Sequence, residues 1–430
     1  MGISLKDYLE HVKVKGRLKT IRNEVLRELE VTKYLIENDG KFTVLFENIK
    51  DHTVRAVGNL ITSKHDILDI LDVSSDVEAY RKVLHAMEEP LKFKGSSIES
   101  THEKVEINNL TEILPIAKYY PKDGGYYITS SIVLAGDGDG NYNASIHRLM
   151  LINGRRFAIR IVPRHLYKMF MKFKSVGKDL PVVVLVGVHP AILLSASLSP
   201  PYGVYEMFIA NKLLHNNIKG DLLTSLDIPT PLASEVIMMG RIRHDLQVNE
   251  GPFVDITGTY DTVRLQPVLE IDELWISEDP IFHYILPSGV EHKLLMGFPK
   301  EISIWDAVRK VVPDVVKVNL TMGGCGWLHA VISIRKTHEG DGKNAILAAF
   351  SAHPSLKHVI VVDDDIDANN IEEVEWAIAT RFRADRDLVV ISNVRGSSLD
   401  PTSQDGLTAK MGLDATKPLT NSEKFEKAKL

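Results

Sequence analysis

The feature that most constrains the fold is a long central region, residues 109–287, built from short β-branched and aromatic runs. Runs of this kind, separated by Gly, Pro and Asn, are typical of strands, and many strands with few helices favour a barrel or a sandwich. The runs are Tyr126–Leu134, Asn143–Ile152, Phe157–Val162, Val182–Val188, Val236–Ile242, Asp255–Val263 and Val268–Ile276. The sequence therefore predicts a β-rich domain in the middle of the chain.

The flanking regions mix helices with strands. Residues 1–108 carry amphipathic helical patterns around Leu5–Val12 and Ile67–Met87, with a strand-like Phe42–Phe46 between them. After Pro299, strands and helices alternate. The expected helices are Trp305–Val311, Asn344–Ala352 and Ile371–Phe382, and the expected strands are Val316–Met322, Leu328–Ile334, Val359–Val362 and Leu388–Ser392. We predict a mixed α/β fold with an N-terminal α/β region (1–108), a central barrel domain (109–287) and a C-terminal α/β domain with a terminal helical tail (288–430).

Composition excludes several classes of protein. The chain has 430 residues, 44% of them hydrophobic and 25% charged, as expected for a globular protein of two or three domains. A net charge of −6 gives no global attraction to nucleic acid or to an anionic membrane, and a single cysteine excludes an internal disulfide. The N-terminus lacks an apolar signal region, and His189-Pro190 interrupts the most apolar stretch, Leu180–Leu198, which we interpret as a buried strand followed by a turn. We expect a cytoplasmic protein without nucleic-acid or membrane partners.

The dipeptide Asn153-Gly154, flanked by apolar alternation, predicts a tight β-hairpin. A two-residue turn there pairs Ile152 with Arg155 and, further out, Asn143 with Arg164, so that His165 lies beside Asn143. Cross-strand partners have Cβ atoms about 5 Å apart, which lets Asn143 and His165 bind one ion. Pro163 disturbs the last pairing and leaves the direction of His165 open. The alternative is a pair of polar residues at the rim of a strand.

Glu206 is the third candidate ligand. Pro200-Pro201-Tyr202-Gly203 interrupts regular structure, and the apolar spacing that follows predicts a helix with Glu206 in its first turn. Asn oxygen, His nitrogen and Glu oxygen form a mixed set that suits Mn²⁺ or Mg²⁺. The alternative is a carboxylate that stabilises the helix dipole.

A pair of carboxylates follows in Glu250-Gly251-Pro252-Phe253-Val254-Asp255, where a Gly-Pro turn can direct both acids to one site. Arg148 lies on the same predicted strand as Asn143, and an arginine between two acids can hold a substrate carboxylate while one acid supplies a proton. An offset of five residues puts Asn143 and Arg148 on opposite faces of a regular strand. A bulge is therefore needed if both are to reach one pocket.

Other polar groups have ordinary structural explanations. The run Asp363-Asp364-Asp365 with Asp367 follows a buried strand and is better explained by capping than by a metal. Cys325 has no identifiable base and is read as structural. Lys410 is either a surface lysine or a phosphate ligand.

Taken in order, these motifs are specific in combination. Asn143-Ala144-Ser145-Ile146-His147-Arg148, Arg164-His165, Glu206, the segment Glu250–Asp255 and Thr257-Gly258-Thr259-Tyr260 together resemble the UbiD family of decarboxylases, which use prenylated FMN. The resemblance continues through Asp279-Pro280-Ile281, Val359–Asp367 and Arg395–Pro401, and so covers nearly the whole chain. It implies a central split β-barrel of flavin-reductase type and a C-terminal domain that mediates dimerisation.

The resemblance also implies roles for individual residues. Asn143, His165 and Glu206 would hold a divalent metal against the cofactor phosphate, with a potassium ion nearby in the stretch that contains Ser197. Arg148, Glu250 and Asp255 match the catalytic arginine and two acids, and Asp255 stands where several branches have Glu. The remaining implied cofactor contacts are Ser145, Ile146, His147, Arg164 and Lys410. His147 replaces a smaller residue and is a candidate to face the substrate.

The implied reaction is covalent catalysis by the cofactor on an α,β-unsaturated acid, with loss of CO₂ and protonation by Asp255 or Glu250. A separate flavin prenyltransferase must supply the cofactor. The length of the chain resembles that of compact archaeal members that convert trans-anhydromevalonate 5-phosphate into isopentenyl phosphate, and we expect this small phosphorylated acid as substrate. His147 would provide part of its phosphate site. The alternatives are an aromatic acid such as a polyprenyl-4-hydroxybenzoate and a non-catalytic flavin-binding or assembly protein.

Overall fold

The computed structural model describes residues 2–428. The chain divides into two compact units. The first contains the residues up to Ser74 together with Arg81–His292, and the second contains Ser75–Tyr80 and the chain from Lys293 onward. None of the helices in the described residues is long and apolar enough to cross a membrane.

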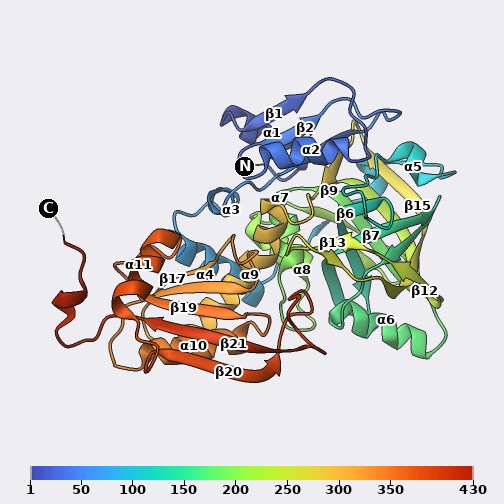
Figure 1. Ribbon diagram of the computed structural model, residues 1–430. Helices are drawn as coiled ribbons and strands as arrows, with labels where there is room; N and C mark the ends of the chain where they lie inside the picture. Colours follow the sequence, from blue (N-terminus) through green and yellow to red (C-terminus); the bar gives the residue numbers. More distant parts are fainter. Residues whose placement is uncertain (1, 429–430) are drawn as a thin grey trace. The chain divides into compact units, whose positions relative to one another are not determined.

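A closed antiparallel β-barrel forms the centre of the first unit (Figure 1). Its strands follow the order β12-β9-β6-β7-β8-β15, and pairing of β12 with β15 closes the ring, while β5 adds to the outside of β15. The strands are β5 (His102–Val105), β6 (Tyr127–Gly136), β7 (Tyr142–Asn153), β8 (Arg156–Ile159), β9 (Leu180–Val188), β12 (Ser234–Glu250) and β15 (Arg264–Ser277). The predicted mixed α/β fold with a central barrel is confirmed.

The barrel core explains the β-branched runs. β9 is buried on both faces, and Val133 on β6 pairs with Val184 on β9, which pairs with Met238 on β12. All three side chains are fully buried. A strand that is covered on both faces reads as a continuous apolar run, which is why residues 180–188 look membrane-like in the sequence.

A mixed four-stranded sheet, β1-β2-β3-β16, accompanies the barrel. Its strands are β1 (Leu18–Ile21), β2 (Thr43–Phe46), β3 (Arg55–Gly58) and β16 (Ile281–Tyr284), and the helices of this region are α1 (Leu5–Val14), α2 (Glu30–Asn38), α3 (Lys64–Leu71) and α4 (Asp76–Glu88). The single helix expected over Ile67–Met87 is wrong. Asp72 ends α3 in the left-handed conformation, and a second helix begins at Asp76.

Short elements connect the barrel strands. They are η1 (Ile98–Ser100), α5 (Leu110–Ile113), α6 (His165–Ser175), α7 (Pro190–Ser197), α8 (Glu206–Leu213), and a small sheet of β4 (Lys94–Gly95), β10 (Lys219–Leu223) and β11 (Ile228–Pro231). The turn expected after Val188 is instead helix α7, which Pro190 begins at its first position. The strand expected over Asp255–Val263 is mostly loop and contains only the two-residue strand β14 (Tyr260–Asp261), which pairs with β13 (Phe253–Val254).

The second unit is a five-stranded sheet with helices on both faces. Its strands run in the order β17-β18-β19-β21-β20, with α10 packed at Gly412 of β21 and α11 packed against Ile360 and Val362 of β19. The elements are α9 (Val290–Val308), which begins in the first unit, β17 (Val315–Leu320), β18 (His329–Ile334), α10 (Asp341–Ala352), β19 (His358–Asp363), α11 (Ile371–Arg381), β20 (Leu388–Arg395), β21 (Leu407–Ala415) and η2 (Ser422–Phe425). The sequence pattern missed β21. Of the predicted terminal tail, residues 429–430 lie outside the described chain.

Candidate active site

Arg148 lies at the centre of a cluster of acids. Its Nε and Nη2 donate to the two carboxylate oxygens of Glu250 at 2.9 Å each, its Nη1 donates to Asp255 at 3.0 Å, and its Nη2 also donates to Asp261 at 3.1 Å. The Arg148 side chain is 10% exposed and that of Glu250 is fully buried. The structure thus brings together the three residues predicted to be catalytic, and these hydrogen bonds raise the already high pKa of Arg148 against the effect of burial.

The pairing of β7 is regular from Asn143 to His147, and the irregularity lies opposite Arg148 in the neighbouring strand β6. The register between β6 and β7 shifts between Ile128 and Ser131, so the two residues Thr129 and Ser130 lie opposite Arg148. Ser130 donates its hydroxyl to the carbonyl of His283, and the Thr129 hydroxyl accepts the N–H of Ile285. Side-chain hydrogen bonds to β16 and to the residue that follows it therefore hold the bulge in β6 in place.

The two acids are carried by a turn that leaves the end of β12. Glu250 is the last residue of that strand, and the Gly251-Pro252 bond is cis. The N–H of Gly124 donates to the carbonyl of Pro252, and Tyr127 donates its hydroxyl to Glu250 at 3.2 Å. Asp255 is less buried than Glu250, with 18% of its side chain exposed. The turn is thus fixed on the side of Glu250 and more open at Asp255.

Glu206 lies where the sequence placed it, in the first turn of α8, and its environment suits a metal ligand. Its side chain is buried, and Oε2 accepts the N–H of Ala144, the neighbour of Asn143, at 2.8 Å. Burial raises the pKa of Glu206 to about 8. Glu206 forms no ion pair with a Lys or Arg among the described residues, and a bound cation would satisfy its ionised form.

The hairpin register predicted for His165 is wrong. Gly154 and Arg155 form the turn, because Asn153 pairs with Arg156, and a second shift between Leu151 and Asn153 displaces the ladder further. β8 ends at Ile159, and Asn143 pairs with Ala135 on the other neighbouring strand. His165 is instead the first residue of α6, where its ring packs edge-on against Tyr202. A metal site shared by Asn143, His165 and Glu206 stays a prediction.

Asn143, Ser145 and His147 form a hydrogen-bonded chain along β7. The Asn143 amide donates to the Ser145 hydroxyl at 3.0 Å, that hydroxyl contacts Nε2 of His147 at 2.9 Å, and Nδ1 of His147 contacts the carbonyl of Arg160 at 2.8 Å. Burial lowers the pKa of His147 to about 4, so the ring is neutral near pH 7. A neutral ring adds no positive charge, and a role of His147 at the substrate phosphate stays a prediction.

The remaining predicted cofactor contacts, and Ser197 in the stretch expected near potassium, lie on separate elements. Ile146 pairs with Ile132, Arg164 is an exposed residue preceding α6, and Ser197 ends α7 with its hydroxyl donated to the carbonyl of Leu194. Lys410 belongs to the second unit, where its ammonium donates to the carbonyls of Pro354 and Leu356, and burial lowers its pKa to about 8. It is therefore not a surface lysine, and its contact with a phosphate stays a prediction.

Sequence reasoning missed three charged residues of the cluster. Asp261 binds Arg148 and Arg264, and Arg160 follows β8 beside Arg148, whose carbonyl accepts its N–H. The sequence could have revealed Arg160 if the hairpin turn had been placed at Gly154-Arg155. Counting outward from that turn, and including the shift between Leu151 and Asn153, puts Arg160 directly across from Arg148. Two arginines at such a position repel each other unless an anion lies between them.

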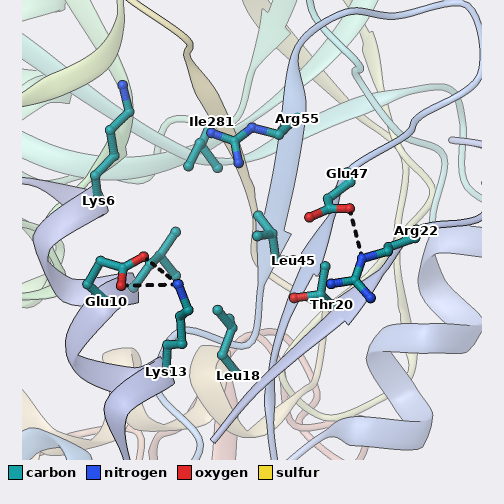
Figure 2. Close-up of a pocket in the computed structure, with 11 residues that line it drawn as sticks. Lys6, Glu10, Lys13, Leu18, Thr20, Arg22, Leu45, Glu47, Arg55 and Ile281 are labelled. Atoms are coloured by element: carbon teal, nitrogen blue, oxygen red, sulfur yellow. Dashed lines mark hydrogen bonds and ion pairs between the residues drawn. The ribbon is translucent and has the colours of Figure 1, made fainter. Parts of the chain in front are cut away.

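Two other polar features lie apart from this cluster. Figure 2 shows a pocket between α1 and the sheet of β1, β2, β3 and β16, in which Glu10 binds Lys13 and Glu47 binds Arg22. None of the predicted site residues lines it. Elsewhere, Asp179, His244 and Asp245 lie close enough for a metal, but two guanidiniums, those of Arg241 and Arg243, already pair with Asp179.

Three domain models of one enzyme family match successive parts of the chain. Models of the N-terminal, Rift-related and C-terminal domains of 3-octaprenyl-4-hydroxybenzoate carboxy-lyase match residues 9–87, 93–290 and 293–415. The chain belongs to the UbiD family. Among UbiD relatives, the chain is 44% identical to anhydromevalonate phosphate decarboxylase of Aeropyrum pernix, over 99% of this chain and 96% of the relative. It is 41% identical to the enzyme of the same name from Methanothermobacter thermautotrophicus, over 98% of this chain and 99% of the relative.

Solved UbiD structures share the fold. The UbiD-class enzyme HmfF from Pelotomaculum thermopropionicum, in complex with FMN, superimposes with a TM-score of 0.96 at 36% identity and covers 99% of this chain and 97% of its own. Vanillic acid decarboxylase of Sedimentibacter hydroxybenzoicus, in its open form, gives a TM-score of 0.88 at 25% identity, with 99% of this chain and 95% of its own covered. The likeness therefore extends over both units.

Proposed function

We propose that this chain is a carboxy-lyase that uses prenylated FMN to decarboxylate trans-anhydromevalonate 5-phosphate, giving isopentenyl phosphate. The observation that carries the proposal is the contact of Arg148 with Glu250 and Asp255. The relatives named anhydromevalonate phosphate decarboxylase, at 41% to 44% identity over nearly the whole chain, support the substrate. FMN and prenylated FMN in complexes of HmfF support the cofactor.

The residues around Arg148 have different roles in the proposed reaction. Arg148 orients the substrate carboxylate, and the fully buried Glu250 keeps the guanidinium in place through two hydrogen bonds. The bond from the α-carbon to the carboxylate breaks, CO₂ leaves, and Asp255 donates a proton to the α-carbon. Asp255 suits this task because its partial exposure lets it regain a proton from water. When bound, the prenylated flavin supplies the electron sink for the cleaved bond.

The metal ligands complete the cofactor site in this proposal. Asn143, His165 and Glu206 would hold Mn²⁺ or Mg²⁺ against the cofactor phosphate, with potassium nearby, and Lys410 would bind that phosphate. The buried Glu206 carboxylate, which lacks a cationic partner among the described residues, supports the fit of a cation. The proposal includes a flavin prenyltransferase that supplies the cofactor, a cytoplasmic location and a homodimer or a larger assembly based on it.

The decisive experiment offers two substrates separately. The chain is produced together with a flavin prenyltransferase, and CO₂ release is measured with trans-anhydromevalonate 5-phosphate and with 4-hydroxybenzoate. We expect turnover of the phosphorylated acid only, and loss of that activity in Arg148→Gln but not in the matched surface variant Arg156→Gln. Turnover of the aromatic acid alone would replace the proposed substrate. A wild-type protein that carries the flavin but releases no CO₂ from either acid would favour a non-catalytic role.

A further inference from the structure

Arg160 is a partly buried cation without a close acceptor. Its side chain is 18% exposed, and its one ion pair among the described residues is long, with 3.9 Å between its Nε and Oδ2 of Asp261. Both oxygens of Asp261 are already bonded, Oδ2 to Arg148 and Oδ1 to Arg264. Burial, followed by the charges of Arg264 and Arg148, lowers the pKa of Arg160. The guanidinium of Arg160 therefore has hydrogen-bond donors available beside two other guanidiniums, whose charge Asp261 and Glu250 partly offset.

The backbone fixes Arg160 beside the predicted carboxylate site. Its N–H donates to the carbonyl of Arg148, its carbonyl accepts from His147, and the next residue, Ile161, donates its N–H to the buried Gln266 at 2.9 Å. Arg264 lies two residues from Gln266 on β15 and pairs with Glu250 in the β12–β15 ladder. Arginines from β7, from β15 and from the residue that follows β8 thus meet around Asp261.

We propose that Arg160 and Arg264 form an anion subsite for the substrate phosphate, next to Arg148, which binds the substrate carboxylate. Neighbouring strands place their Cα atoms about 5 Å apart, so Arg148 and Arg160 can hold two anionic groups joined by a short carbon chain. The proposal rests on the proposed function and names the part of the site that selects a phosphorylated acid. An aromatic acid without a second anionic group would leave this subsite unused.

The cofactor phosphate would bind at a different place from the substrate phosphate. Asn143, the predicted metal ligand, lies five residues before Arg148 on β7, which corresponds to about 17 Å of strand. A phosphate held by a metal at Asn143 therefore lies far from Arg160. In this proposal, the start and the middle of β7 serve two different phosphates.

The test compares two substrates in the enzyme loaded with prenylated FMN. The acids are trans-anhydromevalonate 5-phosphate and the same acid without phosphate, and the readout is the ratio of their kcat/KM values. We expect Arg160→Gln to lower this ratio by about 30-fold or more, mainly through KM, because a charge-assisted contact to the phosphate is lost. Arg160→Lys should restore part of it. A purely structural role of Arg160 would lower both values alike and leave the ratio unchanged.

Control variants distinguish failure of the anion subsite from failure of the proposed function. Arg156→Gln, on the strand that precedes Arg160, removes an arginine that pairs with Glu270, and it should keep the wild-type ratio. If Arg160→Gln does not fold with its flavin, Arg264→Gln tests the subsite by the same ratio of kcat/KM values. Arg264 suits this purpose because 31% of its side chain is exposed, so its substitution should disturb the fold less. A ratio within about threefold of wild type in the folded variant would overturn the subsite alone. No CO₂ from the phosphorylated acid with the wild-type enzyme would instead overturn the proposed function.

Discussion

At the scale of residues, one guanidinium is shared among carboxylates that differ in exposure. Glu250 is fully buried and binds Arg148 with both oxygens, whereas Asp255 uses one oxygen and keeps 18% of its side chain exposed. Because a proton donor must exchange with solvent and a positioning group must not move, the two acids are suited to different tasks. Substitution of each should therefore give a different kinetic result.

We expect Asp255→Asn to lower kcat by about 10²- to 10⁴-fold with little change in KM, because the amide cannot donate the required proton. Glu250→Gln should raise KM as well, since Arg148 loses the partner that orients it. Steady-state CO₂ release with the flavin content of each variant measured provides the check. Equal losses of kcat at unchanged KM in both variants would contradict the division of roles.

Asp123 gives a prediction about stability and pH. Burial raises its pKa to about 6 although backbone N–H groups, among them that of Tyr120, bond its charged form. A carboxyl whose pKa is higher in the folded state stabilises the fold below its unfolded pKa and loses this contribution as the pH rises through its folded pKa. The free energy of unfolding of the wild type, relative to Asp123→Asn, should fall by about 3 kcal/mol between about pH 4 and 7. Urea denaturation of both proteins across this range measures the difference, and a constant difference would refute the prediction.

At the scale of elements, the turn after β12 depends on close approach of two backbones. A Cβ at Gly124 would lie 2.2 Å from the carbonyl oxygen of Gly251, which belongs to the segment between Glu250 and Asp255. A Cβ at the adjacent Gly125 would meet nothing nearer than 3.5 Å. Only a glycine therefore fits at the first position, and the neighbouring position is tolerant.

We expect Gly124→Ala to displace this turn and to lower kcat/KM at least 10-fold, while Gly125→Ala keeps activity near the wild-type value. The measurement is CO₂ release by both variants, with circular dichroism to show that each is folded. Full activity of Gly124→Ala would show that the turn can shift without effect on Arg148.

Elements were predictable from the sequence where their signals were local. Pro200-Pro201-Tyr202-Gly203 and the apolar spacing after it predicted helix α8 correctly. The β-branched and aromatic runs predicted the barrel correctly. Register was not predictable, because the turn moved by one residue to Gly154-Arg155 and the bulges near Thr129 and Leu151 shift the pairing. A register error of one residue changes every cross-strand neighbour, which is why Arg160 was missed and His165 was misplaced.

At the scale of the whole molecule, the second unit presents an apolar sheet edge. β20 is the edge strand, and Val390 on it is 58% exposed beside its partner Met411, which is 37% exposed, with Leu388 on the same face. Edge strands with exposed apolar side chains favour pairing with another chain. This surface supports the predicted assembly through the region after Pro299.

We expect a dimer at micromolar concentration, and Val390→Asp should shift it toward monomer because a charge would be buried in the interface. Leu222→Asp is the matched control, since Leu222 is 61% exposed on a strand of the first unit. Size-exclusion chromatography with light scattering reports the mass of each protein. A monomeric wild type, or a dimer unchanged by Val390→Asp, would contradict this prediction.

The closed barrel also sets the order in which the chain can fold. The last strand of the ring is β15, and it must pair with β12 and β8 and also with β5, which lies about 160 residues earlier in the chain. Until residue 277 has left the ribosome, β8 and β12 have unpaired edges exposed to other nascent chains. Contacts this distant in sequence form slowly because the loop must close first. Truncated chains that end before Arg264 should therefore aggregate rather than form a smaller stable barrel.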